Sequence, residues 1–201
     1  MRFLKHVAAM ALLTLSLLTT MKFSANAITR LKKLEGFRST AYPDGNSSTG
    51  AQLYSTGYGH QIGLHEHELI TQKISTSKGV SLMMADLAPL EIQLNRDLKV
   101  SATQSQFDVL GLFGYNLGSG VLAKVISTWN STHNTKDVTD QILLYNKTHD
   151  NKTGKLVVSP TLVARRHEDV ALFNTPGTGI HKMAVPLVAV GALVGAYLLL
   201  T

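Results

Sequence analysis

Residues 34–60 read LEGFRSTAYPDGNSSTGAQLYSTGYGH, and they mark a change from helical to extended structure. Ahead of them, apolar residues at helical spacing from Ile28 to Leu34 predict a short amphipathic helix that ends at Glu35-Gly36. After it the chain is rich in Gly, Ser, Thr and Tyr and contains the turn signal Pro43-Asp44-Gly45. The stretch therefore predicts a helix followed by a small β-hairpin sheet over residues 41–62, with a loop at residues 46–52.

The rest of the chain up to about Phe173 is predicted to be helical. One helix carries an apolar face made of Met84, Leu87, Leu90, Leu94 and Leu98. The next begins at the capping box Thr103–Gln106, is interrupted at residues 118–120 and resumes over 121–129. Further helices are expected over 137–145 and from Ser159-Pro160 onward, where Ser is a favoured N-cap and Pro a favoured first residue. The predicted fold class is α+β, with a small β-hairpin lobe, a larger helical lobe and a cleft between them.

Composition excludes several kinds of chemistry. The sequence of 201 residues contains no cysteine, which excludes disulfides, zinc–thiolate sites and thiol nucleophiles. The net charge of +6 comes mainly from the chain ends. Of 19 Lys and Arg, four lie in terminal segments (Arg2, Lys5, Lys22 and Lys182), which leaves 15 against 13 Asp and Glu. A balance this close to neutral does not favour nucleic-acid binding.

The first 27 residues have the features of a secretory signal peptide or signal anchor. Two basic residues precede a mostly apolar run from Val7 to Met21, and Ala25-Asn26-Ala27 is a small-x-small cleavage site. The pattern favours cleavage after Ala27. A retained anchor, or a weak anchor that is later released, remains an alternative. We expect the catalytic domain to cover residues 28–175.

The C-terminal residues 184–201 form a second apolar run, which follows a linker at 176–183 and carries no charge. Its length is near the minimum needed to cross a bilayer. It is predicted to be a transmembrane tail, with a buried core helix or a removable lipid-anchor signal as alternatives. We therefore expect an exported protein that is attached to a membrane, with its catalytic domain facing the cell wall.

Glu35 and Asp44 are candidate catalytic carboxyl groups. Glycoside hydrolysis needs a proton donor on one side of the glycosidic bond and a second carboxylate on the other. A helix end that leads into a hairpin can direct both groups into one groove. Two acids at this spacing are more often solvated surface groups, so the surrounding residues have to decide between the two interpretations.

Those surroundings resemble the phage-type lysozymes, the endolysins of glycoside hydrolase family 24. Eight residues separate Glu35 from Asp44, and a Gly57-Tyr58-Gly59-His60 turn follows, as in that family. Two later stretches also look like the family: 106–120, with YNLGSG at its end, and 160–173, with two adjacent arginines. The resemblance runs in order from about Thr29 to Asn174.

The resemblance implies roles for individual residues. Glu35 would protonate the leaving oxygen, while Asp44 would stabilise the oxocarbenium-like transition state and, with Ser55, position the attacking water. Ser55 stands where the family has Thr, and the longer loop before it makes Thr56 a rival. His60 and Asn116 are candidate substrate-binding residues; the alternatives are that His60 braces its turn and that Asn116 caps a backbone. For His60 a zinc site is disfavoured, because the His-Glu-x-x-His spacing is missing.

The resemblance further implies an inverting muramidase that cuts between N-acetylmuramic acid and N-acetylglucosamine in bacterial peptidoglycan. No cofactor or metal is expected, and the protein is expected to be a monomer. A non-catalytic relative that binds glycan strands and fixes the membrane to the wall is the alternative, because a shared fold does not prove activity.

Overall fold

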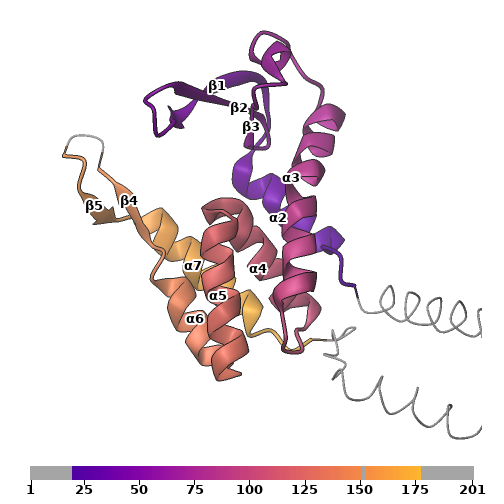
Figure 1. Cartoon of the computed structure of the whole chain (residues 1–201), viewed down its shortest axis with the longest axis vertical. Coiled ribbons are helices and arrows are strands. Elements are labelled where there is room, and N and C mark those ends of the chain that lie inside the picture. The colour runs from indigo at the N-terminus through magenta and orange to yellow at the C-terminus, as the bar shows by residue number, and fades with distance from the viewer. Residues whose placement is uncertain (1–19, 151–152, 178–201) are drawn as a thin grey trace, which may run out of the picture.

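The computed structural model describes residues 20–150 and 153–177, which form a small lobe containing a sheet and a larger helical lobe (Figure 1). Helix α2 (Ala25–Glu35) leads into strand β1 (Arg38–Asn46), strand β2 (Gln52–Gly57), strand β3 (His60–Gln61) and the short 3₁₀ helix η1 (His67–Ile70). Helix α3 (Thr76–Asp97) then connects to the helical lobe, which contains α4 (Gln104–Leu117), α5 (Ser119–Thr132), α6 (Thr135–Leu143) and α7 (Pro160–Phe173). The predicted α+β lysozyme-like fold class is confirmed.

The sheet of the small lobe is antiparallel, in the order β1-β2-β3. Its register pairs Tyr42 with Ser55 and Arg38 with Gly57, with irregularities between these pairs. The two-residue turn between β2 and β3 lies between Gly57 and His60, and Gly59 in it has φ +84°. Such a φ favours glycine, so the local sequence fixes where this turn forms. The predicted hairpin is confirmed, with a third short strand added to it.

Helix α3 connects the lobes, and it contacts β2 and β3 as well as α4 and α5. Its buried face includes Met83, Leu87, Leu90 and Leu94. Met84, which was predicted to lie on this face, is 43% exposed. The prediction was wrong by one position: both residues fit the three-and-four spacing, but at 3.6 residues per turn Met83 lies near the middle of the face of Leu87, Leu90 and Leu94, whereas Met84 lies at its edge.

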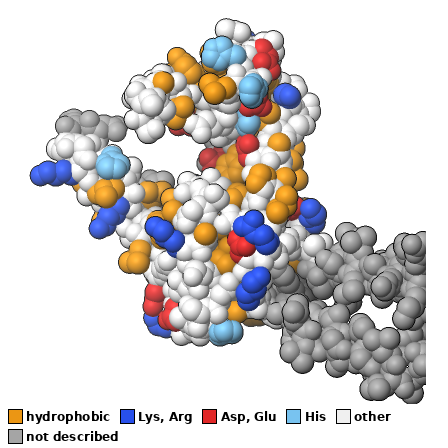
Figure 2. All heavy atoms as spheres, viewed as in Figure 1, with side chains coloured by type: hydrophobic (Ala, Val, Ile, Leu, Met, Phe, Trp, Pro, Cys, Tyr) orange, Lys and Arg blue, Asp and Glu red, His pale blue; other side chains and the backbone are white. Residues whose placement is uncertain are grey.

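Each lobe has its own apolar core. The core of the helical lobe gathers side chains from α2 to α7, including Leu31, Phe107, Phe113, Ile142 and Phe173. A smaller cluster of Leu69, Ile74 and Leu82 packs under the sheet with Phe37 and Ile62. Two cores joined by one helix leave a recess between the lobes, which Figure 2 shows as an open hollow with acidic side chains at its inner end.

The packed domain begins earlier in the chain than the predicted start at Ile28. The side chain of Met21 is buried, and the ring of Phe23 lies 5.4 Å from that of Phe107. Gly111 allows this approach, because a Cβ there would lie only 1.9 Å from the Phe23 ring. The chain ahead of Ile28 is thus part of the helical lobe.

Polar contacts hold the same segment. Ser24 is the N-cap of α2, where its Oγ accepts a hydrogen bond from the backbone N–H of Ala27 at 3.1 Å. The Ser24 hydroxyl donates to Asp108 Oδ2 at 2.5 Å, and its backbone N–H donates to Asp108 Oδ1 at 3.0 Å. Residues 25–27, the predicted cleavage site, form the first turn of α2, where a side-chain cap satisfies an otherwise unpaired backbone group.

Most of the two predicted targeting segments lies outside the described residues, which exclude 1–19 and 178–201. Within residues 20–150 and 153–177, no helix is long and apolar enough to cross a bilayer. The transmembrane tail at 184–201 therefore stays a prediction.

The later elements follow the local signals closely. The capping box Thr103–Gln106 is present at the start of α4, and Ser159 caps α7 with Pro160 as its first residue. Sequence patterns did not indicate the hairpin of β4 (Lys147–His149) and β5 (Leu156–Val158), which projects from the helical lobe (Figure 1). All six of its strand residues are exposed, so it lacks the alternating pattern by which a half-buried strand is recognised.

Candidate active site

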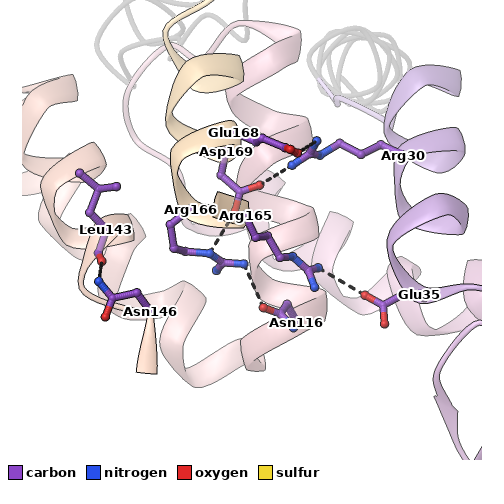
Figure 3. Close-up of polar contacts among 9 residues, drawn as sticks. All are labelled: Arg30, Glu35, Asn116, Leu143, Asn146, Arg165, Arg166, Glu168 and Asp169. Carbon is purple, nitrogen blue, oxygen red and sulfur yellow. Dashed lines mark hydrogen bonds and ion pairs between the residues drawn. The ribbon is translucent and has the colours of Figure 1, made fainter. Parts of the chain in front are cut away.

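Glu35 is the last residue of α2, at the point where the chain passes from helix to sheet. Gly36 follows with φ +67° and turns the backbone toward β1. The Glu35 Oε1 atom accepts a hydrogen bond from Arg165 Nη2 at 3.3 Å (Figure 3), and the side chain is 22% exposed. Since Oε1 is engaged by Arg165, the other carboxyl oxygen, Oε2, is the one that faces the turn between β2 and β3.

Arg165 and Arg166 lie in the second turn of α7 and contact different residues. They are the two adjacent arginines of the stretch 160–173 that resembles the family. Arg165 pairs with Glu35 itself, whereas Arg166 points into the helical lobe and is 1% exposed (Figure 3). Arg166 Nη2 donates to Asn116 Oδ1 at 3.0 Å, and its Nε lies 3.2 Å from Asp169 Oδ2. Buried arginine is costly unless it is paired, so these contacts fix how α7 presents Arg165.

The pair Arg166–Asp169 is buried deeply enough for desolvation to dominate. Burial lowers the pKa of Arg166 and raises the pKa of Asp169, although each partner opposes the shift of the other. Arg30 on α2 adds a second cation, with its Nη2 at 2.9 Å from Asp169 Oδ1. This cluster ties α7 to α2, the two helices that bring Arg165 and Glu35 together.

Asp44 and Ser55 meet across the β1–β2 hairpin. The Ser55 hydroxyl donates to Asp44 Oδ2 at 2.6 Å, and the Ser55 side chain is fully buried. Thr56, its rival in the sequence, donates to the Arg38 carbonyl at 3.4 Å and therefore faces away from Asp44. Successive residues of a strand point to opposite faces of the sheet, so only one of the two hydroxyls can serve Asp44. In this structure it is Ser55.

The turn between β2 and β3 lies against Glu35. A Cβ at Gly59 would lie 3.4 Å from Glu35 Oε2 and 4.0 Å from the hydroxyl of Tyr115. Tyr115 on α4 donates its hydroxyl to the Tyr58 carbonyl at 2.8 Å. The turn is thus held between the end of α2 and the end of α4.

His60 does not offer a free ring nitrogen to a substrate in this structure. Its Nδ1 lies 2.9 Å from Asp86 Oδ2, and its Nε2 lies 3.0 Å from Glu66 Oε2. These partners extend beyond the turn that His60 was expected to brace. Within residues 20–150 and 153–177, no group of His, Cys, Asp and Glu side chains could hold a metal ion.

Asn116 is likewise engaged by the protein. Its side-chain oxygen accepts from Arg166, so the contact that the structure gives it is neither of the alternatives considered, a backbone cap or a sugar ligand. Its place at the end of α4, next to Tyr115, keeps it near the recess.

A groove of about 410 Å³ continues the recess between β3, α3 and the α4–α5 junction. It is lined by Gly59, Gln61, Asp86, Leu90, Tyr115 and Ser119, among others. A larger hollow of about 630 Å³ lies at the other end of α2, around Ser24 and Gly177. Glu35, Asp44 and Ser55 line neither hollow, but Gly59, whose Cβ direction meets Glu35 Oε2, lines the smaller groove, so that groove is the one that lies beside Glu35.

Two contacts of this site were not predicted from the sequence. They are the contact of Asp86 with His60 and the hydrogen bond that Tyr115 donates to the Tyr58 carbonyl. Asp86 lies 26 residues from His60, and no local pattern links them. Tyr115 stood within a motif that was singled out, but its hydrogen-bond partner is 57 positions away.

Comparison with known proteins agrees with this geometry. Residues 32–169 match the family model described as phage lysozyme. The chain is 33% identical over 156 residues to an endolysin of Bacillus phage B103, a match that covers 77% of this chain and 55% of that protein. It is 29% identical over 156 residues to an endolysin of Acyrthosiphon pisum secondary endosymbiont phage 1, covering 77% of this chain and 99% of that one. The chain thus spans about half the length of the first relative and nearly all of the second.

A solved structure of an endolysin is also similar to this chain. The endolysin from Escherichia coli O157:H7 phage FAHEc1 superposes with a TM-score of 0.63 at 26% identity, and the match covers 77% of this chain and 94% of that chain.

Proposed function

The chain belongs to the phage lysozyme family, and on that premise we propose that it hydrolyses the β-1,4 bond between N-acetylmuramic acid and N-acetylglucosamine in peptidoglycan. One observation carries the assignment of the acid. Glu35 Oε1 is bound by Arg165, while Oε2 lies at the Gly59 turn, which lines the groove. A carboxyl group whose Oε1 is held by an arginine can deliver a proton from Oε2, on the side of the Gly59 turn.

In the proposed reaction, Glu35 gives its proton to the glycosidic oxygen as the bond between that oxygen and C1 of the muramic acid breaks. Positive charge develops on the ring oxygen and C1, as in other glycosidases. Proton delivery by a positioned side chain contributes roughly 10²–10⁴-fold to rate. Loss of this proton should therefore remove most of the activity.

Asp44 takes the second role in this proposal. It accepts a proton from the water that attacks C1 on the opposite face of the sugar, which gives inversion. Ser55 supports it by donating a hydrogen bond at 2.6 Å, which fixes the orientation of the carboxylate. Because the Ser55 side chain is fully buried, we infer that it acts mainly by orienting Asp44.

We further propose that the protein works from a membrane as a monomer, with the domain facing the cell wall. The support is the sequence: apolar runs at 7–21 and 184–200 flank the folded domain. A tethered hydrolase reaches only the nearby cell wall. Its high local concentration there takes the place of a high affinity for the wall.

Clearing of outer-membrane-permeabilised bacteria by the full chain tests the enzymatic assignment. We expect the turbidity to fall with the unchanged protein and to stay constant with Glu35→Gln, at equal folded content by circular dichroism. Glu68→Gln is the matched control, because Glu68 is exposed and lies in the short helix η1 away from the recess. Substantial clearing by Glu35→Gln would remove Glu35 from the mechanism. No clearing by the unchanged folded protein would contradict the proposed activity itself.

A further inference from the structure

A single hydrogen bond joins the two lobes directly beside the catalytic acid. Tyr115 is on α4, in the helical lobe, and its hydroxyl donates to the Tyr58 carbonyl at 2.8 Å. Tyr58 lies in the turn between β2 and β3, in the small lobe, where its ring is buried and lies 5.4 Å from that of Phe37. The accepting carbonyl therefore belongs to a residue that is itself anchored by packing.

The turn that receives this bond forms one wall of the space around Glu35. The Cβ direction of Gly59 points at Glu35 Oε2 at 3.4 Å and at the Tyr115 hydroxyl at 4.0 Å. The three groups thus converge on one point, and the oxygen involved is the one that Arg165 leaves free. Gly57, which ends β2, and Gly59 in the turn have positive φ, +64° and +84°, a backbone conformation that glycine adopts without strain.

The surroundings of the Tyr115 hydroxyl favour its neutral, hydrogen-bond-donating form. Burial raises the pKa of Tyr115, and the nearby charges of Asp86 and Glu35 raise it further. A neutral phenol that is buried needs a hydrogen-bond acceptor, and the Tyr58 carbonyl is that acceptor.

We propose that Tyr115 is a positioning residue for glycoside hydrolysis, one that holds the Tyr58-Gly59 turn against Glu35 and so fixes the direction in which the Glu35 proton is delivered. The inference rests on the proposed function of Glu35 as the acid. Tyr115 acts through the turn, while its ring lines the groove beyond Gly59. Its hydroxyl, not its ring, is the part that carries this role.

The test is Tyr115→Phe in the full chain, which removes the hydroxyl and keeps the ring. A neutral hydrogen bond contributes roughly 0.5–1.5 kcal/mol, so we expect kcat on peptidoglycan strands to fall by about 2- to 12-fold. KM should stay within about twofold. The alkaline limb of the pH–kcat profile, which reports the general acid in the bound complex, should also move. A residue that merely supports the fold would lower the melting temperature and leave that limb in place.

Tyr145→Phe is the matched control, because Tyr145 packs edge-on against Phe113 at 5.4 Å and lies in the helical lobe. The proposal is supported if kcat and the pH profile change in Tyr115→Phe alone. It is overturned if kcat and the profile match the unchanged protein, if only KM rises, or if Tyr145→Phe has the same effect. Failure of the unchanged protein to cut peptidoglycan would instead contradict the proposed function, so the two failures are distinguishable.

Discussion

His60 Nδ1 and Asp86 Oδ2 lie 2.9 Å apart and join the sheet of the small lobe to α3. The imidazole is almost fully buried, and Glu66 Oε2 lies 3.0 Å from its other nitrogen. Two carboxylates on one buried ring favour its protonated form. The hydrogen bond to Asp86 is the largest cause that raises the pKa of His60 above its ordinary value of 6.5, while burial opposes it.

This pair makes stability depend on pH. Because the pKa of His60 is higher in the folded protein than in the unfolded chain, the charged ring contributes stability fully below pH 6.5. That contribution disappears as pH rises through the folded value. We expect Asp86→Asn to lower the melting temperature by roughly 3–10 °C near pH 5.5 and by less at pH 9. Thermal melts of both proteins across this pH range measure the change in melting temperature. A change that grows with pH would contradict the proposed charge pairing of His60 with Asp86.

Ser55→Ala should impair catalysis more than folding. The change removes the hydrogen bond to Asp44 and leaves that carboxylate free to rotate. We expect kcat to fall by about tenfold, which corresponds to about 1.4 kcal/mol. Ser81→Ala is the control, since Ser81 is exposed on α3 and its hydroxyl donates only to a carbonyl of its own helix. Equal activities of the two variants would exclude an orienting role for Ser55.

Ser55→Thr tests the difference from the family pattern. It keeps the hydroxyl but adds a methyl group at a fully buried position. Overpacking of this kind costs roughly 1–3 kcal/mol of folding free energy. We therefore expect retained activity with a lower melting temperature, measured by circular dichroism. A variant that is as stable as the unchanged protein would mean that the strand relaxes around the methyl.

Arg165→Met should reduce kcat with little change in overall stability. It removes the only described donor to Glu35 Oε1 among residues 20–150 and 153–177, so the acid loses its fixed orientation. The expected fall is about tenfold. Arg165→Lys should recover only part of it, because an ammonium lacks the planar geometry of guanidinium. Arg96→Met, which disrupts an exposed pair with Asp97, is the control. Full activity of Arg165→Met would show that Glu35 needs no such partner.

A chain that starts at Ile28 should be much less stable than one that starts at Thr20. It lacks the Ser24 N-cap, worth about 1 kcal/mol, and the buried Met21 side chain, worth roughly 2–5 kcal/mol. It also exposes the pocket that Phe23 fills beside Gly111. We expect a melting temperature lower by about 10 °C or more. Equal melting temperatures would mean that residues 20–27 contribute little, and that cleavage after Ala27 would leave the domain intact.

Local sequence signals predicted those parts of the fold that are stabilised locally. The Thr103–Gln106 capping box and the Ser159-Pro160 start depend on backbone groups within a single helical turn. The motif from Glu35 to His60 also placed Asp44 and Ser55 near each other, because a hairpin brings close in space what is close in sequence.

Contacts between distant segments were beyond such reasoning. Whether Arg165 or Arg166 reaches Glu35 depends on the rotation of α7, which the buried contacts of Arg166 set. His60 and Tyr115 contact residues of other elements, and the identity of His60 or Tyr115 alone does not indicate which residues those are. The packing of Met21 and Phe23 against the helical lobe was not predicted, because both lie in the first 27 residues, whose composition is that of a signal sequence.

The two ends of the described chain meet on one side of the molecule. Ser24 and Gly177 line the same hollow, and Glu35 lies at the opposite end of α2, about 16 Å away along an 11-residue helix (Figure 1). A short peptide joining Thr20 to Gly177 would therefore close the polypeptide into a ring without crossing the catalytic groove. New ends could then be opened in the exposed β4–β5 hairpin, so the architecture of the described domain is suited to circular permutation, and to immobilisation through either Thr20 or Gly177 with the groove still accessible to a polymer as large as the cell wall.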